Sequence, residues 1–181
     1  MGKKLSEITD GLKEFIKEQR IFFVATASID SRVNLSPKGS DSLRVIDSNR
    51  VVWQNLTGSG NETASHIREV NRITIMFCAF DGKPNILRLY GTATEVQPND
   101  EDWVKWEKLF PSHVGTRQFF DVKVDLVQTS CGFQVPFFEY VGERGLLDKW
   151  AQAKGQEGIE EYWQTKNSMS IDGKPIKIYQ K

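Results

Sequence analysis

The sequence predicts a mainly β (α+β) fold, namely a small antiparallel barrel of six or seven strands with helices at its periphery. Short runs rich in apolar and β-branched residues follow one another between residues 21 and 130. Brief turn-forming segments separate them, so neighbouring runs pair as hairpins. One helical segment interrupts the strands after the fourth. Six or seven consecutive antiparallel strands with a helix after the fourth favour a small barrel over a sandwich or a parallel sheet.

The elements can be assigned in order along the chain. Residues 6–19 place Ile8, Leu12, Phe15 and Ile16 on one face, which predicts an amphipathic helix. Three hairpins follow, with strands at 21–27 and 32–36, at 42–46 and 50–54, and at 72–80 and 86–96. A short helix is expected at 61–70, between the second and third hairpins. Gly91 lies inside a predicted strand, which indicates a β-bulge or a close backbone approach.

Beyond Pro98 the pattern becomes more helical. Trp103, Trp106 and Leu109 predict a helix whose tryptophans serve core or dimer packing, and 119–130 alternates like a last barrel strand. Residues 146–164 read as two short helices broken near Gly155 and Gly158. We therefore expect a single domain over 1–181, with a core at about 20–130 and a helical C-terminal extension at about 140–170.

Composition and charge exclude several classes of protein. The chain has 181 residues, 39% of them hydrophobic and 27% charged, which suits one globular domain. Its 24 basic and 24 acidic residues cancel, which argues against a nucleic-acid-binding or membrane-surface role. No apolar run approaches the roughly 20 residues that span a bilayer, and the first residues form a charged amphipathic stretch, unlike a signal peptide. The default expectation is a cytoplasmic protein.

The cysteines and histidines indicate neither a redox pair nor a metal site. Cys78 and Cys131 are far apart with no C-x-x-C spacing, so we expect two buried thiols. His66 and His113 are the only histidines, which argues against a histidine-based metal site, and we expect no metal. His66 lies one turn into the predicted helix and fits a surface or interface residue better than an acid or base.

The segment from Trp53 to Ile67 is the most informative, because a strand ends in a Gly/Ser/Thr/Asn loop that opens directly into a helix. Gly58 and Gly60 let backbone N–H groups approach an anion, and the helix dipole favours a negative charge at the same place. The alternative is a capping box formed by Ser59 and Glu62, which explains a helix start without any ligand. The loop lacks the lysine of a Walker motif and the third glycine of a dinucleotide fingerprint.

Together these segments resemble the pyridoxamine 5'-phosphate oxidase-like split-barrel flavoproteins. The resemblance rests on Phe23-Val-Ala-Thr-Ala27, Ser36-Pro-Lys-Gly39, the stretch from Trp53 to Ile67 and Arg88-Leu-Tyr-Gly-Thr-Ala93. It covers rather less than half of the chain. The C-terminal segments 130–136 and 167–175 resemble only a narrower, uncharacterised branch. The resemblance implies a split antiparallel barrel that binds FMN. One helix N-terminus and one lysine fit a single terminal phosphate, and no second phosphate site is evident, so we expect FMN and not FAD.

The sequence departs from the family pattern at two places. Oxidases of this family carry an arginine and a lysine at the start of the helix after the loop, where this chain has Asn61-Glu62-Thr63. The phosphate then needs another cation, and Lys38 is the candidate, the alternative being a solvent-exposed turn lysine. The Arg-x-His substrate signature near the C-terminus is absent, which argues against pyridoxamine phosphate as the substrate.

The resemblance and the loop chemistry together yield a set of expected FMN-binding residues. Three of them have competing structural explanations. Asn55 could satisfy its own turn backbone, Trp53 could be a barrel-core residue, and Arg88 could face solvent or pair with a carboxylate instead of an anionic ligand. The residues expected to bind FMN are Ser36, Lys38, Gly39, Trp53, Asn55, Thr57, Ser59, Asn61, Thr63 and Arg88.

Three functions follow from the resemblance. The first is an FMN-dependent oxidoreductase that transfers hydride or electrons between a small-molecule substrate and NAD(P)H or oxygen. The second is a flavin-binding protein for storage, sensing or electron relay without turnover, and the third is a barrel that binds another ligand. Flavin supplies the redox chemistry, so no catalytic triad or paired carboxylates are needed, and no catalytic residue can be assigned.

We also expect a homodimer with the flavin sites at its interface, using Trp103, Trp106 and the aromatic segment 133–138.

Overall fold

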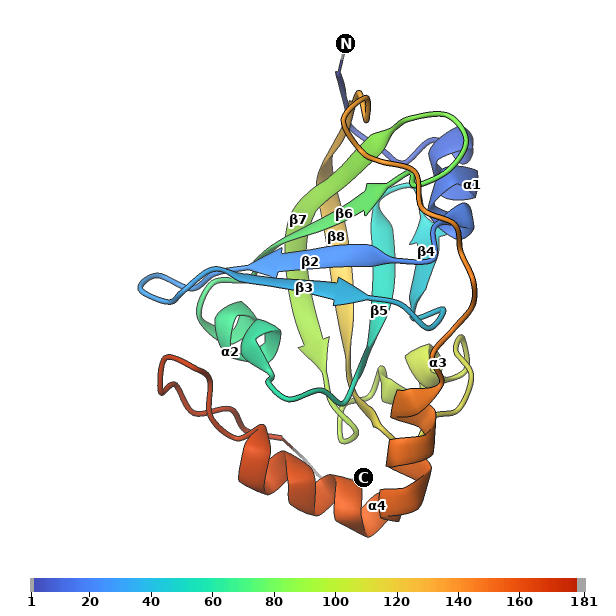
Figure 1. Ribbon diagram of the computed structural model, residues 1–181. Coiled ribbons are helices and arrows are strands. Elements are labelled where there is room, and N and C mark those ends of the chain that lie inside the picture. Colours follow the sequence, from blue (N-terminus) through green and yellow to red (C-terminus); the bar gives the residue numbers. More distant parts are fainter. Residues whose placement is uncertain (1, 179–181) are drawn as a thin grey trace.

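The fold is known from a computed structural model that describes residues 2–178 (Figure 1). The described residues form eight strands and four helices. In chain order these are β1 (Lys3–Leu5), α1 (Asp10–Glu18), β2 (Phe22–Thr26), β3 (Asn34–Lys38), β4 (Leu43–Asp47), β5 (Arg50–Leu56), α2 (Glu62–Glu69), β6 (Arg72–Cys78), β7 (Ile86–Val96), α3 (Trp103–Glu107), β8 (Thr116–Ser130) and α4 (Leu146–Lys166). The prediction of a mainly β fold is confirmed.

All the strands belong to one antiparallel sheet whose path does not close. Its order is β3-β2-β6-β7-β8-β5-β4, and β1 pairs separately with β8. The three predicted hairpins are confirmed as the pairs β2–β3, β4–β5 and β6–β7. The long β8 joins β7 to β5, and the path ends at β3 and β4, as in a split barrel. The seven strands of the path match the predicted number, and β1 was not foreseen.

The core lies between the β2–β3 hairpin and the longer strands, across which that hairpin runs (Figure 1). Trp53 of β5 stacks on Phe120 of β8 with ring centroids 4.9 Å apart, and Phe22 of β2 meets the same indole edge-on. A smaller cluster holds Trp103 and Trp106 against β5 and β8. Both tryptophans are buried within the chain, so the core alternative is correct for them and they are not available to a dimer surface.

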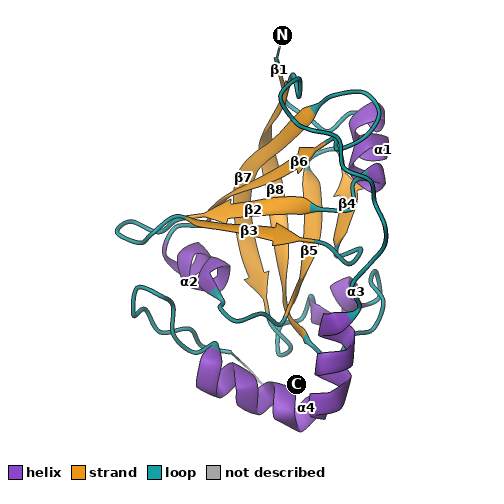
Figure 2. Ribbon diagram, in the orientation of Figure 1, coloured by secondary structure: helices purple, strands orange, loops and turns teal. Residues whose placement is uncertain are grey.

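The helices sit at the edges of the sheet, as Figure 2 shows. Helix α1 begins at Asp10 and not at residue 6, because the backbone of Thr9 is extended and the N–H of Ile8 donates to the carbonyl oxygen of Ser48 at 2.7 Å. Helix α4 breaks at Gly155, whose φ of 65° is left-handed, so the predicted break is confirmed. Helix α2, the end of α4 and the segment after it lie at the same end of the molecule (Figure 1).

Both predictions for Gly91, a β-bulge and a close backbone approach, are confirmed. The β7–β8 register shifts between Tyr90 and Gly91, which marks a bulge. A Cβ atom added to Gly91 would lie 2.0 Å from the carbonyl oxygen of Lys123 on β8. No other residue type fits this close approach between two strands without moving the backbone.

Two predictions about single residues are wrong. His66 is 1% exposed and not a surface residue, because α2 is covered by the barrel on one side and by the C-terminal segment on the other. Cys131 is exposed, because β8 ends at Ser130 and the chain leaves the sheet there, whereas Cys78 is buried as expected. Within residues 2–178, no helix is long and apolar enough to cross a bilayer.

Candidate functional site

A polar cavity of about 240 Å³ lies where the loop after β5 meets β3, β8 and the start of α2. It contains most of the residues that the sequence singled out. Of the ten expected ligands, Ser36, Lys38, Asn55, Ser59, Asn61 and Thr63 line it, together with Asn34, Gly58, Gly60, Glu62 and Arg117. The loop and the Ser36-to-Gly39 corner, which are well separated in sequence, therefore do meet at one place.

Two cations face this cavity, Lys38 from β3 and Arg117 from β8. Lys38 is half-buried, with its Nζ 5.0 Å from the centroid of the Trp53 ring. Burial, reinforced by the charge of Arg117, lowers the pKa of Lys38 to about 8. Burial also lowers the pKa of Arg117 to about 9, although the negative charge of Glu95 opposes that shift. Both side chains are predominantly charged at pH 7.

Neither cation has an acidic partner among residues 2–178 that would neutralise it. None of the ion pairs in that part of the chain includes Lys38 or Arg117, although Arg117 is only 2% exposed. A buried charge is costly unless a partner compensates it. Two such cations beside one polar cavity make it a place where a bound anion lowers the electrostatic free energy.

Arg117 and Asn167 hold the loop of residues 57–61 in place by hydrogen bonds. Arg117 Nη1 donates to the carbonyl oxygen of Gly60 at 3.1 Å and to Asn167 Oδ1. Asn167, at the C-cap of α4, donates from Nδ2 to the carbonyl oxygens of Gly58 and Ser59, at 3.1 and 3.3 Å. The carbonyl groups that would repel an anion are thus engaged, which leaves the loop's N–H groups for a ligand.

The amide of Asn61 is the clearest unfilled donor at the cavity. Asn55 Nδ2 donates to Gln118 Oε1 at 2.7 Å and to Asn61 Oδ1 at 3.4 Å, which orients the Asn61 side chain. Asn61 Nδ2 is buried and has no hydrogen-bond partner among the described residues. A buried N–H without an acceptor costs about 1–3 kcal/mol, so this donor is suited to a ligand oxygen.

The capping-box alternative is not formed. Helix α2 begins at Glu62 with Asn61 as its N-cap, and no side-chain hydrogen bond caps it. The carboxylate of Glu62 instead accepts the backbone N–H of Ile171, at 3.1 and 3.2 Å. The first-turn N–H groups of a helix lack intrahelical acceptors, so this uncapped end adds to the positive potential at the cavity.

The other four expected ligands do not line the cavity. Thr57 is buried and structural, since its Oγ1 donates to the Gly115 carbonyl and accepts the indole N–H of Trp163, each at 2.8 Å. Trp53 belongs to the core, in keeping with the alternative considered for it. Gly39 uses its carbonyl oxygen to accept from Ser42, and Arg88 donates to Ser130 Oγ at 3.0 Å from β7.

Sequence reasoning missed Arg117 and Asn167, which organise the loop. Residues Thr116 to Phe120 are all buried. An arginine within such a strand was the one sequence signal that could have marked Arg117 as a site residue. Asn167 carries no comparable signal, because its role arises only when α4 brings it to a loop more than 100 residues earlier.

The chain is similar to several known proteins. The family model for pyridoxamine 5'-phosphate oxidase matches residues 8–131. A pyridoxamine 5'-phosphate oxidase family protein, ustO, of Aspergillus flavus is 35% identical over 186 residues, which cover 93% of this chain and 75% of the relative. The match reaches well beyond the stretch that the family model covers.

Solved structures share the fold at low sequence identity. HupZ from Group A Streptococcus superposes with a TM-score of 0.53 and 22% identity, covering 66% of this chain and 91% of the other. A candidate pyridoxamine 5'-phosphate oxidase of Lactobacillus delbrueckii gives a TM-score of 0.56 and 17% identity, with 69% and 98% covered. With the matching family model and the fungal relative, the open antiparallel sheet and its polar cavity place this chain in the pyridoxamine 5'-phosphate oxidase family.

Proposed function

We propose that this protein binds FMN by its terminal phosphate in the polar cavity and acts as an FMN-dependent oxidoreductase on a small molecule. The observation that carries the proposal is the meeting of Lys38, Arg117 and the unpaired Asn61 amide at an uncapped helix start. A phosphate monoester offers several acceptor oxygens and nearly two negative charges at pH 7, which suits two cations and several N–H donors.

In this proposal two cations from other elements replace the arginine and lysine that oxidases of the family carry at the start of the helix. The sequence suggested Lys38 alone as the replacement cation. The fold adds Arg117 from β8, so the two charges come from two strands, β3 and β8, instead of from the helix. One phosphate group would use both cations and the N–H donors around them, which favours FMN over a dinucleotide.

The flavin supplies hydride or electron transfer when bound, so the chain needs only to hold it and admit a second reactant. In this proposal Lys38 and Arg117 bind the phosphate, and Asn55 and Gln118 orient Asn61 toward it. A cavity of about 240 Å³ suits the phosphate end of FMN, and the rest of the ligand extends from its mouth. NAD(P)H or oxygen would be the other redox partner.

We further propose a homodimer that shares the flavin site. Exposed aromatic side chains support it, since Phe133, Phe137 and Phe138 are 78%, 82% and 62% exposed. Apolar surface of this kind is typical of protein interfaces. Light scattering on the FMN-loaded protein tests this part: a 20.7 kDa particle that retains its flavin would contradict the shared site.

Purification and reconstitution test the main proposal. The protein should be yellow, or become so with excess FMN, and flavin released by heat should run as FMN on chromatography. Arg117→Met should weaken FMN binding at least about ten-fold, whereas Arg72→Met, on the exposed start of β6, serves as the matched control and should not. Recovery of FAD, or failure to take up FMN, would overturn the cofactor assignment.

Anaerobic reduction separates an enzyme from a storage or sensing protein. Bleaching of the bound flavin by NADH or NADPH, followed by reoxidation in air over repeated cycles, is expected for an oxidoreductase. FMN that stays oxidised with both nucleotides would favour the non-catalytic alternative.

A further inference from the structure

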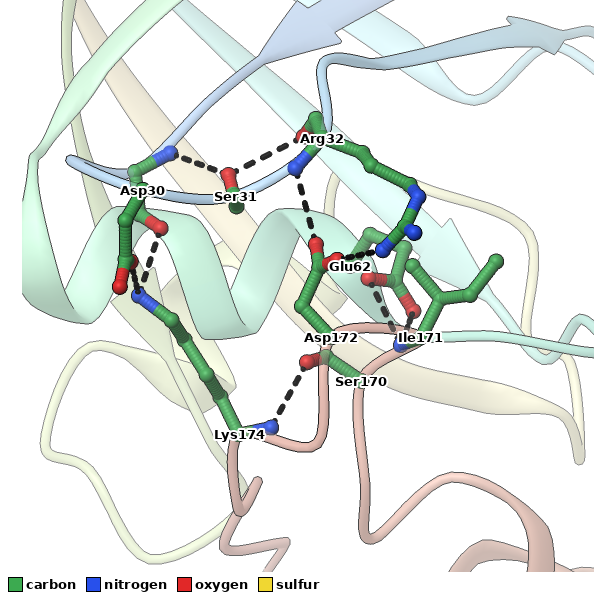
Figure 3. A network of polar contacts seen from close by, with 9 residues as sticks. Asp30, Ser31, Arg32, Glu62, Ser170, Ile171, Asp172 and Lys174 are labelled. Carbon is green, nitrogen blue, oxygen red and sulfur yellow. Dashed lines mark hydrogen bonds and ion pairs between the residues drawn. The ribbon is translucent and has the colours of Figure 1, made fainter.

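A cluster at the edge of the phosphate cavity joins α2 to the C-terminal turn, and its Glu62 lines that cavity as well. One ring nitrogen of His66 and one carboxylate oxygen each of Glu62 and Asp172 lie within 4.8 Å of one another. Glu62 and His66 also line a second cavity of about 560 Å³, next to the first. Figure 3 shows Glu62 and Asp172 side by side, with Arg32 above them.

His66 is the residue that needs explaining. Its side chain is 1% exposed, its Nδ1 lies 3.1 Å from Thr26 Oγ1, and its Nε2 is buried with no hydrogen-bond partner in the described part of the chain. When Nδ1 donates to the threonine hydroxyl, Nε2 keeps a free lone pair that can serve a metal ion held between the ring and the two carboxylates. A hydrogen bond at one ring nitrogen commonly orients a histidine whose other nitrogen binds a metal.

The two carboxylates are incompletely neutralised. Glu62 accepts the neutral backbone N–H of Ile171. Asp172 accepts the backbone N–H of Arg32 at 2.9 Å and pairs with its guanidinium, but that arginine side chain is 72% exposed, so water screens its charge. The arrangement therefore has two negative charges, one solvent-exposed cation and an unshared nitrogen lone pair.

We propose that Glu62, His66 and Asp172 bind one divalent transition-metal cation, with Zn²⁺ the preferred ion. Mg²⁺ and Ca²⁺ favour all-oxygen sites, whereas a set of one imidazole and two carboxylates suits zinc. Three protein ligands leave a fourth position open to the cavity. Zinc ligand bonds are about 2.0–2.2 Å long, so the side chains close in on the ion while Arg32 releases one oxygen of Asp172.

Local sequence patterns provide no reason to expect this site, because a search for metal-binding patterns looks for several histidines at close spacing. Here a single histidine suffices, since folding brings Asp172 to it from over 100 residues away. The ion would connect α2 to the turn that follows Asn167, the residue that holds the phosphate-binding loop.

Isothermal titration of ZnCl₂ into EDTA-treated, dialysed and untagged protein tests the proposal. The Cys131→Ser background removes an exposed thiol that could itself bind zinc. One saturable site per chain is expected, and Asp172→Asn and His66→Gln should each weaken it at least about ten-fold. Circular dichroism checks folding, and Asp172→Asn, which changes a turn, keeps the test usable if the His66 variant does not fold.

Arg32→Gln provides the discriminating result. If Asp172 is a metal ligand, removing the competing guanidinium should tighten zinc binding by roughly three-fold to ten-fold. Glu157→Gln, an exposed carboxylate on α4, is the matched control and should bind zinc like the background protein. Absence of a saturable site, undiminished binding by Asp172→Asn, unchanged binding by Arg32→Gln, or a preference for Mg²⁺ would overturn the proposal. The titrations are run with and without FMN, so that zinc binding is tested separately from the proposed flavin binding.

Discussion

Raising the pH from 7 to 9 should weaken FMN binding about ten-fold through one side chain, Lys38. In the free protein its pKa is lowered to about 8, so about nine-tenths of Lys38 is charged at pH 7 and about one-tenth at pH 9. A bound phosphate favours the charged form and raises that pKa, so binding takes up a proton and affinity falls as the pH rises. The second pKa of the phosphate, about 6, lies below this range and leaves its charge nearly constant.

Arg117 can add to this decline only at the upper limit. Burial lowers the pKa of its guanidinium too, so any loss of its charge begins at higher pH than the loss from Lys38. Lys38→Met should bind FMN about ten-fold to a hundred-fold more weakly at pH 7, since a charged hydrogen bond is worth about 1.5–3 kcal/mol. Its affinity should then change little up to pH 8, where Arg117 is still charged. Lys38→Arg, which retains the charge, should keep tight binding over that range.

Flavin fluorescence titrations at stepped pH measure these affinities, with riboflavin as the ligand that lacks a phosphate. If Lys38 binds the phosphate, riboflavin affinity should be nearly independent of pH and of Lys38. An equal decline for FMN and riboflavin, or an undiminished slope between pH 7 and 8 in Lys38→Met, would refute a phosphate contact from Lys38. In either case Lys38 would act through the fold and not through the phosphate.

Three further predictions concern the fold. Gly91→Ala should lower the free energy of unfolding by about 3 kcal/mol in urea titrations, because the added Cβ would lie 2.0 Å from the carbonyl oxygen of Lys123. Gly11→Ala is the control and should be neutral or stabilising, because a Cβ at Gly11 meets nothing within 4 Å. Thr57→Val should cost about 1–3 kcal/mol by leaving the Trp163 N–H without its acceptor; a loss as small as that of Thr165→Val, on exposed α4, would contradict this. Iodoacetamide should label exposed Cys131 at once and buried Cys78 only upon unfolding, which mass spectrometry can follow; equal rates would contradict the fold.

The three hairpins could be predicted well because their signals are local. Each of the three hairpins joins strands separated by a short turn, and alternation of apolar residues marks their limits. The bulge at Gly91 and the break at Gly155 also follow from single glycines. The short β1 was missed because Lys3-Lys4-Leu5 has no strand pattern of its own and forms only by pairing with β8.

The site could be predicted only in part, for a related reason. The loop and the Ser36-to-Gly39 corner are recognisable by residue type, and most of their polar side chains do line the cavity. Arg117 and Asn167 become site residues through contacts over 50 and 100 positions, which no local pattern encodes. The burial of His66 likewise depends on the C-terminal segment that covers α2.

The contact between Asn167 and the loop has a consequence for the order of events during synthesis. A nascent chain that has emerged up to β8 contains every strand of the sheet and can begin to fold, since domains fold as they leave the ribosome. It still lacks Trp163 and Asn167, which fix Thr57 and the carbonyl groups of Gly58 and Ser59. The cavity at this loop is therefore completed only after α4 has docked, so in the proposed FMN-binding protein the strands of the barrel can pair before the phosphate site exists.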